Sequence, residues 1–102
     1  RYGAAGCTGM GEMAIRSATA HSVVFYLKTG ASVEEAGIRA MQDLNDLGGP
    51  YRAAMNIVAL DSKGTPAGFT STKGRTYIYQ TSDMTRHIEQ ERTFVNVSQR
   101  WN

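Results

Sequence analysis

A run of small residues, from Gly3 to Glu12, opens the chain and leads directly into its first strongly helical stretch. Glycine and alanine leave little side-chain bulk in this run, so its backbone could approach a ligand closely. The unpaired N–H groups and the positive dipole at a helix start favour an anionic atom at such a place. Thr8 adds a hydroxyl that can donate or accept a hydrogen bond beside those amides. Together these features predict a binding loop.

Small residues also allow a helix to pack tightly on a sheet, and this second reading of the run stays open. The spacing Gly6-x-x-Gly9-x-Gly11 does not match the dinucleotide fingerprint, and no Gly-Lys-Ser/Thr follows it, so a nucleotide is not expected. Cys7 is the only cysteine, which excludes an internal disulfide. Its setting between glycine and threonine indicates a small structural residue rather than a nucleophile.

Length and charge limit the classes of protein that this chain can represent. Its 102 residues make at most one domain, which would be marginally stable alone. The net charge of +2 is spread without blocks of like charge, so neither nucleic acid nor a membrane is expected as a partner. No apolar stretch approaches the roughly 20 residues that span a bilayer, and a soluble protein is expected. The start at Arg1, without a methionine, predicts a processed product or part of a longer polypeptide.

Helical periodicity is strong in the first half of the chain. Residues 12–28 are predicted to form one largely buried helix, with His21 in a structural role. The apolar face of this helix comprises Met13, Ala20, Val24 and Leu27. Ser32 is the expected N-cap of a second helix, and Glu35 completes a capping box. The buried stripe of that helix comprises Val33, Gly37, Ala40, Leu44 and Leu47. Gly48-Gly49-Pro50 ends it.

Strand signals dominate the second half. Residues 55–60 and 67–72 predict a hairpin whose turn is formed by residues 61–64, with Pro66 at the start of the returning strand. A third short strand is predicted at residues 77–79. The tail from residue 85 to 102 has no assigned role, and His87 lacks a second ligand at metal-binding spacing, so neither a metal nor another cofactor is expected.

The opening motif resembles a known family. The residues that show the resemblance are Thr8-Gly9-Met10-Gly11-Glu12, then Ile15-Arg16 and His21-Ser22-Val23-Val24. They resemble the Thr-Gly-x-Gly-Glu segment of the glycosylasparaginase and plant-type asparaginase family of N-terminal nucleophile hydrolases. The similarity runs through the strands up to Tyr79, roughly the first four fifths of the chain. It is closer to glycosylasparaginase than to isoaspartyl peptidase.

The resemblance implies an α+β fold, in which residues 1–83 are the C-terminal part of the β subunit in a four-layer αββα sandwich. Residues 84–102 form a tail outside it. The implied partners are an α chain and the upstream part of the β chain, assembled as (αβ)2. The implied reaction is hydrolysis of the side-chain amide of asparagine, or of N4-glycosylated asparagine, to release aspartate. Two alternatives remain: an isoaspartyl peptidase, and a non-catalytic relative that keeps the fold.

The resemblance also implies roles for single residues. Thr8 would give a side-chain donor and Gly9 a backbone N–H to the oxyanion, while Met10 and Gly11 shape the substrate loop. The nucleophilic threonine, exposed by self-cleavage, would lie upstream. Ala54 stands where the strand pair that bears this nucleophile would begin, so the strands that follow are interpreted as the family's later pair. The segment alone is therefore expected to be inactive.

Overall fold

The computed structural model describes residues 1–49 and 54–98, and the chain has a mixed α+β fold, as predicted. In chain order the elements are β1 (Gly3–Gly9), α1 (Gly11–Arg16), α2 (Thr19–Lys28), α3 (Val33–Leu47), β2 (Met55–Asp61), β3 (Pro66–Thr70), β4 (Thr76–Tyr79), β5 (Ile88–Glu91) and β6 (Thr93–Phe94). Pro50, predicted to follow the second helix, and the last residues of the tail, 99–102, lie outside the described residues.

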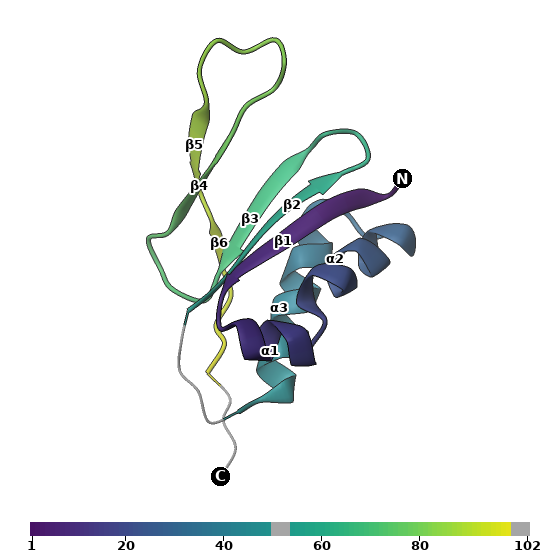
Figure 1. The fold of residues 1–102 in the computed structure, drawn as a ribbon, viewed down its shortest axis with the longest axis vertical. Coiled ribbons are helices and arrows are strands. Elements are labelled where there is room, and N and C mark those ends of the chain that lie inside the picture. The colour runs from purple at the N-terminus through teal and green to yellow at the C-terminus, as the bar shows by residue number, and fades with distance from the viewer. Residues whose placement is uncertain (50–53, 99–102) are drawn as a thin grey trace.

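The main sheet has the strand order β1-β2-β3-β6, and the three helices lie against one of its faces (Figure 1). Strands β1, β2 and β3 pair antiparallel, whereas β6 pairs parallel to β3. Side chains of β2 alternate between buried Met55, Ile57 and Ala59 and the more exposed Asn56, Val58 and Leu60. The first set faces the helices and packs in the core with Phe69 and Met41. The second set defines the outer face of the sheet.

The opening run is a strand, so the loop conformation predicted for residues 3–9 is wrong, whereas the binding role of Thr8 and Gly9 stays a prediction. β1 pairs with β2 along its whole length, from Gly3 opposite Asp61 to Gly9 opposite Met55. Glycine and alanine have low strand propensity, and only the ladder to a strand far away in sequence makes this conformation stable. The small residues serve close packing, because a Cβ on Gly3 would lie 2.7 Å from Cδ1 of Leu27 in α2. At Gly3, therefore, the small residue lets α2 pack closely on the sheet, as the second reading of the run predicted.

The single helix predicted at residues 12–28 is also wrong. It is divided into α1 and α2 by Ser17 and Ala18, and Ala18 adopts left-handed angles, φ 48° and ψ 47°. This break resets the helical phase, so that Thr19 and Val23 are fully buried in place of the predicted Ala20 and Val24. Periodicity alone could not locate a break that no glycine or proline marks.

The second predicted helix, α3, is confirmed with its caps. The Ser32 hydroxyl accepts from the Glu35 N–H, and the Glu35 carboxylate accepts from the Ser32 N–H, as a capping box requires. The helix ends at Leu47, followed by Gly48 at φ 64°. The predicted stripe faces the sheet: Val33, Gly37, Ala40 and Leu44 are buried, and Leu47 is half-buried.

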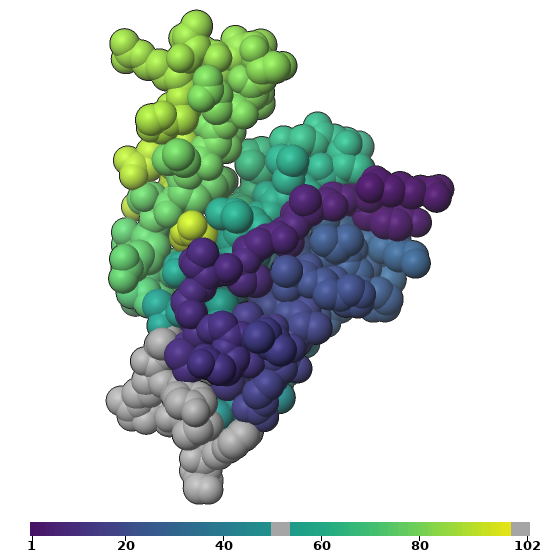
Figure 2. All heavy atoms as spheres, viewed as in Figure 1, coloured from purple at the N-terminus to yellow at the C-terminus, as the bar shows by residue number. Residues whose placement is uncertain are grey.

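The predicted hairpin and third strand are confirmed, but the third strand lies in a separate sheet. Asp61 Oδ1 accepts from the N–H groups of Lys63 and Thr65 in the turn, and Pro66 begins β3. β4 pairs with β5 from the tail, and this hairpin stands away from the rest of the molecule at its outer end (Figure 2). Arg92 links the two sheets, because Nε donates to the Thr76 carbonyl at 2.8 Å and Nη1 to the Ile57 carbonyl at 2.7 Å.

Candidate functional site

A row of polar side chains crosses the outer face at one end of the main sheet. Thr8 in β1 lies opposite Asn56 in β2, and Asn56 lies opposite Thr70 in β3. Side chains that are directly opposite in an antiparallel pair share a face, with Cβ atoms about 4.5–5.5 Å apart. We call Thr8, Asn56 and Thr70 the polar row.

One side of the polar row is rigid. Thr70 is fully buried, and its Oγ1 donates to Asn56 Oδ1 at 2.8 Å while accepting from the Thr72 N–H at 3.1 Å. This bond occupies the carbonyl oxygen of the Asn56 amide and leaves its Nδ2 for other acceptors. Within residues 1–49 and 54–98, neither Asn56 Nδ2 nor the Thr8 hydroxyl makes a hydrogen bond. The row therefore offers two neighbouring hydrogen-bond donors that have no acceptor among the described residues.

Gly9 follows Thr8 and turns its backbone N–H toward the free edge of the sheet. The Met10 N–H donates to the Ala54 carbonyl at 3.2 Å, and antiparallel pairing alternates, so the N–H of Gly9 faces away from β2. β1 is an edge strand of the described sheet and runs uncovered across the surface in Figure 2. Gly9 has φ 114°, and a Cβ there would lie 1.9 Å from the Ala54 oxygen, so only glycine fits.

The other two predicted site residues complete the turn from β1 into α1. The half-buried side chain of Met10 packs against the core, and its carbonyl accepts from the Ala14 N–H at 3.0 Å. Gly11 begins α1 and is exposed, with no atom within 4 Å of where a Cβ would be. Thr8, Gly9 and Gly11 thus border open space, whereas Met10 turns its side chain inward.

Cys7 and His21 are not part of the polar row. The half-buried Cys7 packs against the core, and burial raises the pKa of its thiol. A raised pKa keeps the thiol protonated at neutral pH, which supports a structural role.

His21, also expected to be structural, is exposed on α2 and stacks on Phe25 with ring centroids 6.4 Å apart. The described residues contain no cluster suited to a metal ion. None of the described helices could cross a membrane.

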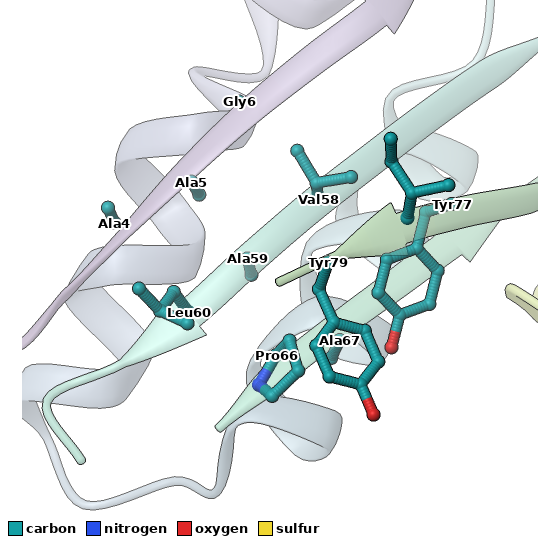
Figure 3. A pocket seen from close by; sticks show the side chains of 11 residues that line it. Ala4, Ala5, Gly6, Val58, Ala59, Leu60, Pro66, Ala67, Tyr77 and Tyr79 are labelled. Atoms are coloured by element: carbon teal, nitrogen blue, oxygen red, sulfur yellow. The ribbon is translucent and has the colours of Figure 1, made fainter. Parts of the chain in front are cut away.

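An apolar groove of about 270 Å³ adjoins the polar row on the outer face (Figure 3). Its floor comes from β1, β2 and β3, and its wall from β4. Val58 and Leu60 on the floor are 42% and 44% exposed, and the wall is formed by Tyr77, Ile78 and Tyr79. Tyr77 covers β3 closely, since a Cβ on Gly68 would lie 2.4 Å from its ring. The groove is open and apolar, whereas the row beside it is polar.

Asn56 and Thr70 were not among the residues predicted for the site. The available signal was an asparagine within an otherwise apolar strand, because asparagine is disfavoured there unless its amide has a task. The pairing of Asn56 with Thr8 could not be read from the sequence, since this register joins segments about fifty residues apart.

Comparison with known proteins gives two matches. A family model described as Asparaginase matches residues 1–89. A plant-type L-asparaginase from Thermococcus kodakarensis is 31% identical over 80 residues, which cover 78% of this chain and 26% of that protein. The chain therefore spans about a quarter of the length of this relative.

Proposed function

This chain belongs to the asparaginase family, and on that basis we propose that it is part of an amidohydrolase that releases aspartate from asparagine-type side-chain amides. One observation carries the proposal. The unfilled Thr8 hydroxyl and the outward-facing Gly9 N–H lie next to each other within a Thr-Gly-x-Gly-Glu motif. Two donors at one point suit the oxyanion that forms when an amide is attacked.

In the proposed reaction, a threonine outside this chain attacks the side-chain amide carbon, and its own α-amino group takes the hydroxyl proton. The carbonyl oxygen becomes negative and accepts hydrogen bonds from Thr8 Oγ1 and Gly9 N. Collapse expels ammonia or a glycosylamine and leaves an aspartyl ester, which water then hydrolyses. Met10 shapes the turn from within, while Gly11 leaves space for the substrate.

The proposed fold is the four-layer αββα sandwich, of which this chain would supply one helical layer and one sheet. Two features support it: the outer face carries exposed apolar residues such as Val58 and Leu60, and β1 has an unpaired edge among the described residues. A second sheet on that face would bury them. We assign residues 1–83 to this domain, as the C-terminal part of a β subunit. The tail, residues 84–102, is assigned to the margin of the domain. The partners would be the upstream β segment and an α chain, in an (αβ)2 assembly.

Of the possible substrates, N4-glycosylated asparagine is favoured by the continuation Ile15-Arg16 to Val24, which is closer to glycosylasparaginase. The test uses the complete protein that contains this chain. Purified protein is examined by N-terminal sequencing, and then assayed with L-asparagine, with N4-(N-acetylglucosaminyl)-asparagine and with a β-aspartyl dipeptide.

We expect a new N-terminal threonine and release of aspartate from the glycosylated substrate. Aspartate from L-asparagine alone would keep the amidohydrolase and change its substrate. Release from the dipeptide alone would make the protein an isoaspartyl peptidase. Absence of both a threonine N-terminus and any hydrolysis would identify a non-catalytic relative.

A further inference from the structure

We infer that Asn56 supplies a further side-chain hydrogen bond to the reacting amide oxygen, and that Thr70 positions it; this inference rests on the proposed function. The starting point is the register. Asn56 lies directly opposite Thr8 on the outer face, in a pair whose backbone groups bond to each other. Its amide therefore sits one strand away from the Thr8 hydroxyl, within reach of the same small acceptor.

The Asn56 amide has a defined orientation. Its Oδ1 accepts from the Thr70 hydroxyl at 2.8 Å, which is closer to that hydroxyl than the Thr72 carbonyl at 3.2 Å, and Thr70 Oγ1 itself accepts from the Thr72 N–H at 3.1 Å. Thr70 is fully buried, so this arrangement is shielded from water. With Oδ1 engaged on the β3 side, the NH2 group is the part of the amide that remains available to an acceptor on the outer face.

The backbone that bears Asn56 is also fixed. The neighbouring Met55 N–H donates to Ser71 Oγ at 2.9 Å, and the Met55 carbonyl accepts from the Ser71 N–H at 3.0 Å. A donor on a strand end that is bonded on both sides changes little during a reaction. Preorganised donors of this kind stabilise developing charge without reorganisation.

The amide nitrogen of Asn56 is available to a ligand. An asparagine is disfavoured in a strand, and no acceptor in the described part of the chain takes either hydrogen of Nδ2. The Thr8 hydroxyl is unfilled beside it. A ligand oxygen between the two would satisfy both groups.

The test is steady-state kinetics of the complete protein with the substrate that it hydrolyses, beside a melting curve for each variant. Asn56→Ala should lower kcat by about 10²-fold, the usual loss for one oxyanion donor, with a much smaller change in KM. Asn56→Asp keeps the size and the Thr70 bond but replaces the donor with a carboxylate, so it should lose at least as much. Asn96→Ala, at an exposed asparagine whose amide donates to Ser98 Oγ, is the matched control and should keep full activity.

The positioning role of Thr70 is tested by combining its substitution with that of Asn56. Thr70→Val removes the hydroxyl at nearly constant shape and should lower kcat about tenfold, because the amide is no longer oriented. In Asn56→Ala, adding Thr70→Val should cause no further loss of kcat. Additive losses would show that Thr70 acts on its own.

The outcomes separate this inference from the proposed function. Normal kcat in both Asn56 variants, with a large loss in Thr8→Ala, would remove Asn56 from the site and leave the function standing. A loss in the Asn56 variants that follows the melting temperature would make its role structural. Normal kcat in the Thr8 and Asn56 variants alike would refute the proposed site as a whole.

Discussion

Gly37 in helix α3 lies so close to Phe69 in β3 that a Cβ on the glycine would be 2.0 Å from Cε2 of the ring. The phenyl ring is fully buried and fills the space between helix and sheet. An alanine normally stabilises a helix by roughly 1 kcal/mol relative to glycine. At this position the steric conflict with a core aromatic ring reverses the sign.

We therefore expect Gly37→Ala to lower the free energy of unfolding by about 1–3 kcal/mol, the usual cost of an overfilled core. Chemical unfolding of the complete protein measures it. Gly11→Ala is the control, because a Cβ there meets nothing within 4 Å, and this variant should be neutral or slightly more stable. Equal stability of the Gly37 variant and the wild type would mean that α3 can move away from the sheet.

The protein is expected to gain stability when Ala18 is replaced by glycine. Its left-handed angles cost an L-residue about 1–2 kcal/mol, whereas glycine adopts them freely. Part of the gain is offset by the entropy of glycine, so Ala18→Gly should raise stability by up to about 1 kcal/mol. Ala20→Gly, inside α2, should instead lose about 1 kcal/mol. A melting temperature that falls in both variants would show that α1 and α2 form one continuous helix.

Gly9 should not accept any side chain. Gly9→Ala combines φ 114° with a Cβ that would be 1.9 Å from the Ala54 oxygen, so we expect a loss of at least about 1–3 kcal/mol in the free energy of unfolding. Gly74→Ala is a matched control, since it has φ 85° but open space around the Cβ. Its smaller loss gives the cost of the backbone angle alone. If the two variants lose the same amount, the β1–β2 contact at Ala54 is not tight.

Thr8 is exposed, so Thr8→Ala should leave the melting temperature unchanged. In the complete protein, kcat should fall about 10²–10³-fold with little change in KM, because the hydroxyl bonds more strongly to the transition state than to the substrate. Thr8→Ser keeps the hydroxyl and should recover most of the activity. Thr85→Ala, at an exposed threonine between β4 and β5, should behave as wild type. A Thr8→Ala enzyme with normal kcat would exclude the hydroxyl from catalysis.

The sequence by itself determined the elements whose signals are local. Helix α3 was predicted with its Ser32 cap and buried stripe, because capping and 3.6-residue periodicity involve residues a few positions apart. The β2–β3 hairpin was predicted for the same reason, since turn residues from Asp61 to Gly64 and the flanking strands are adjacent in the chain. The Thr8-Gly9 motif was also visible, as an uninterrupted run of residues.

Only the tertiary structure decided what the opening run is. Its glycines and alanines indicate a loop locally, and they form β1 because β2, about fifty residues later, supplies hydrogen bonds along the whole run. The same long-range register places Thr8 beside Asn56, so the composition of the polar row was hidden from sequence reasoning. Local signals reveal elements, whereas pairing between distant strands depends on the free energy of the whole packed sheet.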